Sequence, residues 1–264
     1  MNAFVKLLEI MKQSGEKPPL FGAFHIMSLI IITAVTIILC KKMKSPTEES
    51  VRRFLLAVSL AALFLEVYKQ IVYSFDIVNG RAIFSYKWHV FPWQFCSTPM
   101  FAGLAAALIK NRVIHRMLVC YLATYGLAAG VLISLFPASA FSSIFGINIQ
   151  TMFCHGSMVT VGVFLLRCGY VKREARNLYL AFFPFVLGVA VALLLNRAAY
   201  LRGIPEGQVF NMYFISPYFK DDIPILEPLK RLLPPFLFQS AYLLIFTLLA
   251  SAALFLFGKR KPTL

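Results

Sequence analysis

The sequence predicts an all-α protein that crosses a membrane several times. Hydrophobic residues make up 59% of the 264 positions and charged residues only 14%, whereas a soluble domain carries about 25% charged residues. The mean hydropathy is +0.75, and several apolar runs reach the length of about 20 residues that a spanning helix needs. A soluble core does not need so much apolar surface, so we expect a single transmembrane domain over residues 1–264.

The first 20 residues are expected to lie on the membrane surface. Apolar side chains recur at positions 4, 7, 8 and 11, which is a helical spacing, and these 20 residues contain neither a long apolar core nor a small-residue cleavage site. This pattern is typical of an amphipathic interfacial helix and not of a signal peptide. Pro18 and Pro19 are expected to end the helix.

Seven apolar runs follow, and each is predicted to be a spanning helix. We place them at residues 22–42, 53–75, 88–109, 113–135, 149–170, 177–196 and 236–257. Gly126 and Gly130 form a GxxxG pattern in the fourth run, which favours close packing within the bundle. Residues 197–235, between the sixth and seventh runs, are expected to form a long outer loop.

The basic residues predict the orientation of the bundle. Connections on one side carry 15 Lys and Arg residues and those on the other side carry 10. Since cytoplasmic loops are enriched in Lys and Arg, we expect the N-terminus outside and the C-terminus inside. The net charge of +15 then reflects topology and contacts to anionic headgroups, and a nucleic-acid partner is not expected.

Four reactive side chains lie inside the predicted spans: Glu66, Lys69, Cys96 and His155. A charge at the bilayer centre costs at least about 2.5 kcal/mol, so such residues indicate a function. With a rise of about 1.5 Å per residue, all four lie about 10–15 Å below the outer surface. The sequence therefore predicts a polar site in the outer half of the membrane.

Each of these residues has a structural and a chemical interpretation. Glu66 and Lys69 stand at i, i+3, so they form either a structural ion pair or an anchor for a headgroup, with Lys69 binding phosphate. Cys96 is either a small apolar side chain or a nucleophile whose base is His155. A metal site of Glu66, Cys96, His155 and His25 lacks a spacing such as HExxH, so neither a metal nor a cofactor is expected.

Four segments resemble the YwaF-type bacterial integral membrane proteins. They are FPWQFCSTP at 91–99, Glu66 with Lys69, FCHGSM around His155, and Asn196 with FNMYFISP at 210–217. That family is similar to the eukaryotic transmembrane protein 164 family, which is associated with acyl transfer between phospholipids through a Cys and a His. The resemblance covers most of the chain in order, and it implies a multi-pass protein of the bacterial plasma membrane that acts on membrane phospholipids.

The family pattern carries over to particular residues. His155 matches the family His and Cys96 matches the bacterial Cys, so these two are the implied catalytic pair. In the eukaryotic relatives the reactive Cys directly follows the Pro, where this chain has Trp93, and a His is usual where this chain has Gln94. Besides Glu66 and Lys69, the candidates for substrate binding are His25, Gln94, Asn196, Asn211 and Tyr213.

Three functions stay open on the sequence alone. The first is an intramembrane enzyme that transfers or hydrolyses lipid acyl chains through Cys96 and His155. The second is a carrier or lipid-binding protein without turnover, in which Glu66, Lys69 and His155 bind a solute or protons. The third is a structural or sensory seven-helix protein whose buried polar groups only satisfy one another.

Overall fold

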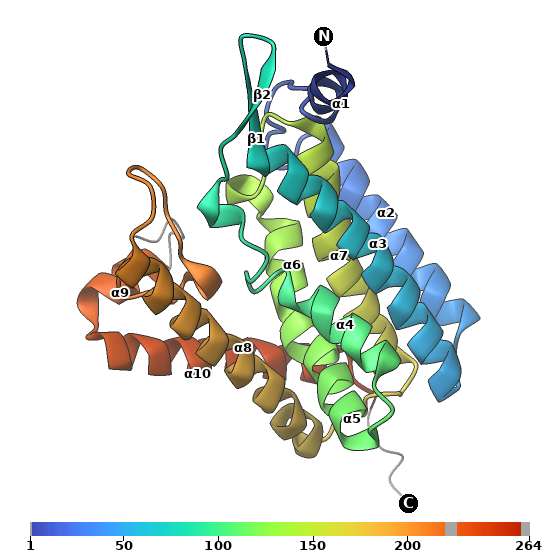
Figure 1. Ribbon diagram of the computed structural model, residues 1–264. Coiled ribbons are helices and arrows are strands. Elements are labelled where there is room, and N and C mark those ends of the chain that lie inside the picture. Colours follow the sequence, from blue (N-terminus) through green and yellow to red (C-terminus); the bar gives the residue numbers. More distant parts are fainter. Residues whose placement is uncertain (1, 220–225, 260–264) are drawn as a thin grey trace, which may run out of the picture.

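The protein is a bundle of helices with one small β-hairpin (Figure 1). The computed structural model describes residues 2–219 and 226–259. Within these residues, six helices are long and apolar enough to cross a membrane. They are α2 (Ala23–Lys42), α3 (Glu48–Ser74), the continuous run from α5 (Arg112–Tyr121) to α6 (Leu127–Leu135), α7 (Phe145–Arg167), α8 (Ala175–Arg202) and α10 (Pro235–Phe257).

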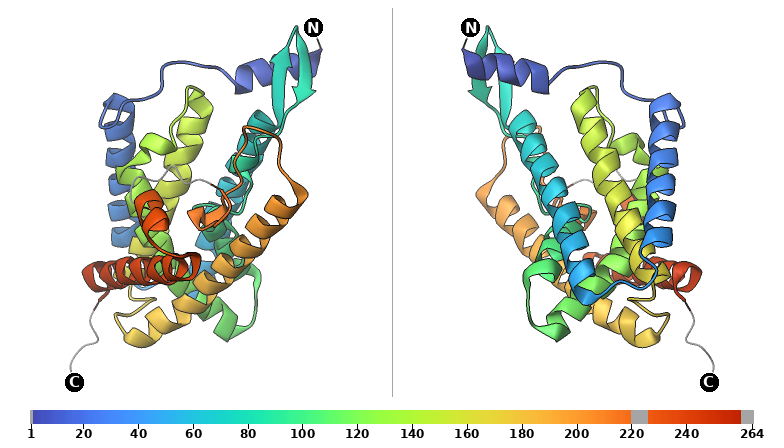
Figure 2. Two further views of the ribbon diagram at one scale, coloured as in Figure 1. Left: turned by 90° about the vertical axis from the view of Figure 1, so that its left-hand side faces the viewer. Right: turned by 90° about the vertical axis from the view of Figure 1, so that its right-hand side faces the viewer.

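The outer surface of the long helices is apolar. Phe64 on α3, Leu187 on α8 and Leu248 on α10 are each at least 60% exposed. Soluble monomers rarely expose contiguous apolar patches, so a surface of this kind fits the hydrocarbon of a bilayer. Figure 2 shows α2 on the outside of the bundle beside α7. The membrane-embedded, multi-pass character expected from the sequence is therefore supported.

The third predicted span differs most from the sequence prediction. Of residues 88–109, only α4 (Thr98–Leu108) is α-helical, and a single 3₁₀ turn, η1 (Trp88–Val90), precedes it. Pro92 disfavours helical geometry at Phe91, whose backbone is extended (φ −48°, ψ 134°), and Pro99 stands at the start of α4. The expectation of seven complete spanning helices is not confirmed, because an irregular segment and a short helix take the place of the third.

The other spans agree with the prediction to within a few residues, with two differences. A π-helical turn, η2 (Leu122–Gly126), interrupts the run between α5 and α6. Such turns occur mostly where a helix has to accommodate close neighbours or a functional site. Helix α8 ends at Arg202, six residues beyond the predicted end at Asn196.

Helix α1 (Ala3–Met11) covers one end of the bundle together with the hairpin. The helix ends at Met11, well before Pro18, and its last carbonyl accepts a hydrogen bond from the Tyr68 hydroxyl (2.6 Å). Strands β1 (Phe75–Val78) and β2 (Arg81–Phe84) pair antiparallel across an Asn79-Gly80 turn. Both turn residues have positive φ (51° and 70°), as the type I′ hairpin turn requires.

One carboxylate fixes α1 to the hairpin. Asp76 on β1 pairs with Lys87 (2.8 Å) and with Lys12 (3.1 Å), which directly follows α1. Hydrogen bonds from Lys87 and then Lys12 lower the pKa of Asp76 to about 2. The N-terminal segment is thus attached to the same end of the bundle as the hairpin.

The predicted outer loop enters the bundle in part. After α8 the chain forms a short 3₁₀ turn, η4 (Met212–Phe214), and later α9 (Leu226–Leu232). Phe210, Met212 and Ile215 are buried, so this stretch packs among the helices. Residues 220–225 of the predicted loop, and Arg260 and Lys261 of the tail, lie outside the described residues.

Only one glycine of the GxxxG pattern makes a close approach. A Cβ at Gly130 would lie 2.7 Å from Met158 Cβ and 2.9 Å from the His155 carbonyl oxygen on α7. A Cβ at Gly126 would meet nothing closer than 3.6 Å, an ordinary contact. Gly130 therefore allows α6 and α7 to touch, as expected for packing within the bundle.

We expect Gly130→Ala to destabilise the protein by about 1–3 kcal/mol, the usual cost of forcing a methyl group into a packed contact. Gly126→Ala is the matched control within the same pattern, and it should leave the stability nearly unchanged. The measurement is the thermal unfolding midpoint of each variant in detergent. Equal midpoints for the two variants would contradict the close contact at Gly130.

Candidate functional site

Glu66 and Lys69 form a buried ion pair on the inner face of α3. Lys69 Nζ lies 2.8 Å from Glu66 Oε2, and the two side chains are 13% and 6% exposed. Gln70 Nε2 donates to the other Glu66 oxygen (2.7 Å) and to the Val90 carbonyl (2.8 Å), while the Tyr86 hydroxyl donates to Gln70 Oε1 (2.8 Å). Both Glu66 oxygens are therefore satisfied, and the network ties the irregular segment before α4 to α3.

Cys96 lies two residues before α4 begins. It is within electrostatic range of Lys69 and Glu66, and Cys154 and Tyr213 are in turn within range of Cys96. The Cys96 side chain is only partly buried. The irregular backbone before α4 thus places a thiol within electrostatic range of the buried Lys69 ammonium group.

His155 on α7 has one ring nitrogen without a hydrogen bond to the described residues. It is only 6% exposed, and its Nδ1 lies 2.7 Å from the Thr151 carbonyl oxygen. Because a carbonyl only accepts, Nδ1 carries the proton of the neutral ring and Nε2 has a free lone pair. Among the described residues, no hydrogen bond reaches Nε2. His155 can therefore accept a proton at this atom.

Lys69 interacts electrostatically with both candidate catalytic residues, Cys96 and His155. It lies within electrostatic range of His155 as well as of Cys96 and Cys154. No hydrogen bond joins Cys96 to His155 among the residues that the structure describes. Catalytic hydrogen bonds are often absent before substrate binds, so a missing bond does not exclude proton transfer between the two side chains.

An apolar groove of about 300 Å³ opens along α3 next to the ion pair. Its polar lining comes mainly from Glu66 and Gln70, and its far wall comes from Pro92 and Phe101. The remaining lining is largely hydrocarbon. A groove with apolar walls and a carboxylate at its inner side suits an amphipathic ligand such as a lipid.

Three of the other predicted site residues hold in place the segment around η4 that enters the bundle after α8. Gln94 accepts a hydrogen bond from the Tyr213 N–H (3.0 Å) and donates to the Asn211 carbonyl (3.1 Å). Asn196 on α8 pairs with both backbone groups of Met212, at 2.8 and 3.0 Å. Asn211 Oδ1 accepts from the Ser216 N–H (2.9 Å). These amides replace the helical hydrogen bonds that irregular backbone lacks at membrane depth, and their role in substrate binding stays a prediction.

Tyr213, in the same segment, has an unusual backbone geometry and a buried hydroxyl group. Its backbone is left-handed (φ 60°, ψ 8°), a strained geometry for a bulky residue. Its hydroxyl bonds to Thr98 Oγ1 (2.8 Å), which also bonds to the Tyr121 hydroxyl (2.9 Å). A Cβ at Gly188 would lie 2.3 Å from the Tyr213 hydroxyl. The glycine on α8 thus makes room for a tyrosine that lies within electrostatic range of Cys96.

His25 belongs to a different part of the bundle. It is 0% exposed, its Nε2 donates to the Ser134 carbonyl (2.8 Å), and its Nδ1 accepts from the Phe21 N–H (3.0 Å). Its ring also packs against Phe141. Since both nitrogens are used, His25 joins the start of α2 to the end of α6 and has no free atom for a substrate.

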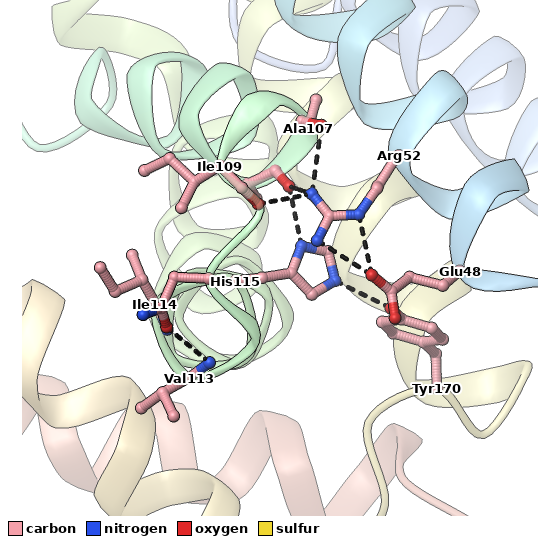
Figure 3. Close-up of polar contacts among 10 residues, drawn as sticks. Glu48, Arg52, Ala107, Ile109, Val113, Ile114, His115 and Tyr170 are labelled. Carbon is pink, nitrogen blue, oxygen red and sulfur yellow. Dashed lines mark hydrogen bonds and ion pairs between the residues drawn. The ribbon is translucent and has the colours of Figure 1, made fainter.

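A polar cluster that the sequence analysis did not predict lies at the far end of α4 (Figure 3). Arg52 donates to three carbonyls where α4 ends (2.7–3.2 Å) and pairs with Glu48 (2.9 Å). His115 Nδ1 donates to the Ala106 carbonyl (2.7 Å), and its Nε2 accepts from the Tyr170 hydroxyl (2.8 Å). Because the last carbonyls of a helix lack partners, this cluster fixes the end of α4. In the sequence analysis, Arg52 was counted only among the basic residues that set the topology.

No group of three or more His, Cys, Asp or Glu side chains is placed to hold a metal ion in the described part of the chain. The arrangement around Cys96 contains a thiol, an ammonium group, a hydroxyl and a neutral imidazole. These groups are the components of nucleophilic acyl chemistry.

Comparison with known proteins gives one match. The model of the TMEM164 family matches residues 20–259. No curated protein and no solved structure shows significant similarity to the chain.

Proposed function

Because the chain belongs to the TMEM164 family, we propose that it is an intramembrane enzyme that transfers phospholipid acyl chains through Cys96 and His155. The observation that supports this most is the free Nε2 of a buried, neutral His155 in a group that also contains Cys96 and Lys69. The apolar groove along α3 offers a place for a hydrocarbon chain, and Glu66, the ion-pair partner of Lys69, is part of its lining.

The proposed reaction has two steps. His155 Nε2 takes the Cys96 proton, and the thiolate attacks the ester carbonyl of a phospholipid. The C–O bond breaks, the protonated His155 returns the proton to the departing alkoxide, and a lysophospholipid and an acyl-thioester at Cys96 are formed. The hydroxyl of an acceptor lysophospholipid then attacks the thioester, its proton passes through His155 to the Cys96 sulfur, and the acyl chain is transferred.

Lys69 has an electrostatic role in this scheme. Its ammonium group stabilises the Cys96 thiolate and the oxyanion that forms at the ester carbonyl. Glu66 holds Lys69 in position through the 2.8 Å ion pair. We place the site in the outer half of the bundle, towards the outer leaflet of a bacterial plasma membrane.

We expect His155→Gln to lower acyl transfer by about 10²–10⁴-fold, the usual contribution of a general base. His25→Gln is the matched control, since that buried histidine has both nitrogens engaged and does not belong to the Cys96 group. The measurement is the rate at which a labelled acyl chain passes from phospholipid to lysophospholipid in proteoliposomes, divided by the amount of folded protein. Unchanged turnover in His155→Gln, or bound lipid without any turnover in the wild type, would contradict an enzyme and favour a lipid carrier.

A further inference from the structure

We propose that a second groove, at the opposite end of the bundle, binds an anionic phospholipid. The groove lies between α2, α7 and the segment that follows α10, and its volume is about 470 Å³. Arg167 on its rim is 12 residues from His155 along α7, which corresponds to about 18 Å. It is therefore separate from the Cys96 group and does not depend on the function proposed for that group.

Four cations surround the groove: Lys41, Lys44, Arg167 and Lys259. No Asp or Glu contributes to its lining. None of the four forms an ion pair with the described residues, although six ion pairs occur elsewhere in that part of the chain. Basic pockets between transmembrane helices bind the phosphates of anionic lipid headgroups, so these charges call for an anionic ligand.

The walls of the groove are apolar. Ile37 on α2 and Val163 on α7 face it, and the Thr36 hydroxyl at its inner side is already used in bonds to the Ile32 carbonyl (2.7 Å) and Thr160 Oγ1 (2.9 Å). A free phosphate ion would leave this apolar surface uncovered. A phospholipid would cover it with an acyl chain and place its phosphate among the cations.

The four positive charges of the groove favour anionic over zwitterionic phospholipid headgroups. A zwitterionic headgroup brings its own ammonium or choline group to the four cations, whereas an anionic headgroup does not. We therefore assign the groove to an anionic phospholipid, with the headgroup phosphate between Arg167 and the lysines.

The test compares phosphatidylglycerol with phosphatidylcholine on the purified full-length protein by native mass spectrometry. The groove variant is Lys41→Gln/Lys44→Gln/Lys259→Gln, and the matched control is Lys6→Gln/Lys17→Gln/Arg81→Gln, three exposed cations near the other end. Because one charge near an anionic surface changes affinity about fivefold, the groove variant should bind phosphatidylglycerol at least about tenfold more weakly. The control should bind as the wild type does.

Three outcomes would overturn the proposal: equal losses in groove and control variants, equal binding of phosphatidylcholine by the wild type, and complete displacement of the lipid by inorganic phosphate. The last outcome would identify a site for a free phosphate. If the triple variant unfolds, the single variants Lys259→Gln and Arg167→Gln test the same site through exposed side chains, and each should lower binding about fivefold.

Discussion

Replacing Cys96 with alanine is expected to reduce acyl transfer by at least about 10³-fold while the protein stays folded. The thiol is the only nucleophile of the proposed reaction, and it lies in electrostatic range of Lys69. Its side chain is partly exposed, so truncation leaves no large cavity. The measurement is the same acyl transfer assay in proteoliposomes, with the thermal midpoint as a check on folding.

Cys154→Ala provides the matched control. Cys154 is also a free cysteine in range of Lys69 and Cys96, but its sulfur accepts a hydrogen bond from Gln150 (3.4 Å) and it is adjacent to His155 on the helix, where its side chain points about 100° away. We expect its activity to stay within a few-fold of the wild type. If both alanine variants retain full activity, Cys96 is not the nucleophile and the proposed reaction fails.

Lys69→Met is expected to destabilise the protein by about 3–5 kcal/mol, because it leaves the buried Glu66 carboxylate without its counter-charge. The Glu66 side chain is only 6% exposed and lies 2.8 Å from the ammonium group, so solvent does not screen the lost interaction. The Gln70 amide would still donate to one Glu66 oxygen. Denaturant unfolding of the purified protein measures the change.

The double variant Glu66→Gln/Lys69→Met separates charge from packing. It removes both charges and keeps side chains of similar size, so most of the lost stability should return. Its acyl transfer should nevertheless stay low, because the oxyanion has lost its cation. A double variant as unstable as Lys69→Met would show that the pair contributes through packing and not through charge.

The sequence predicted what depends on residue type and helical spacing. Glu66 and Lys69 lie on one face because i and i+3 are neighbours on any α-helix, and the structure shows their ion pair. The apolar runs of the first, fourth, fifth and seventh spans were long enough to place their helices within a few residues. His155 and Cys96 were predicted at a common depth, and both lie in range of Lys69.

The helix prediction failed for the third span, because tertiary contacts decide the backbone conformation there. An apolar run that contains Pro92 has the composition of a spanning helix, but its backbone is irregular because Gln70, Gly188 and Asn211 offer it hydrogen-bond partners on other elements. Such partners lie 20 to about 120 residues away along the chain, so no local pattern reveals them. The same irregular stretch carries Cys96, which explains why the thiol lies at the centre of the site and not on a regular helix face.

The left-handed backbone geometry at Tyr213 could not be predicted from the sequence either. Tyrosine has no preference for positive φ, and the geometry depends on space at Gly188 and on bonds from Gln94 and Thr98. A segment expected to form a long outer loop therefore enters the bundle and places the Tyr213 hydroxyl within electrostatic range of Cys96. Fold class and candidate chemistry were accessible from residue pattern, whereas the arrangement of the site depends on long-range contacts.

The most direct test of the account is the covalent intermediate at Cys96. Protein incubated with a phospholipid that bears a labelled acyl chain, without an acceptor, should be quenched with acid, digested and analysed by peptide mass spectrometry. The account predicts an acyl group on the peptide that contains Cys96, released by neutral hydroxylamine, absent in Cys96→Ala and retained in Cys154→Ala. An active protein that never carries an acyl group at Cys96, or carries it on another residue, would contradict the account.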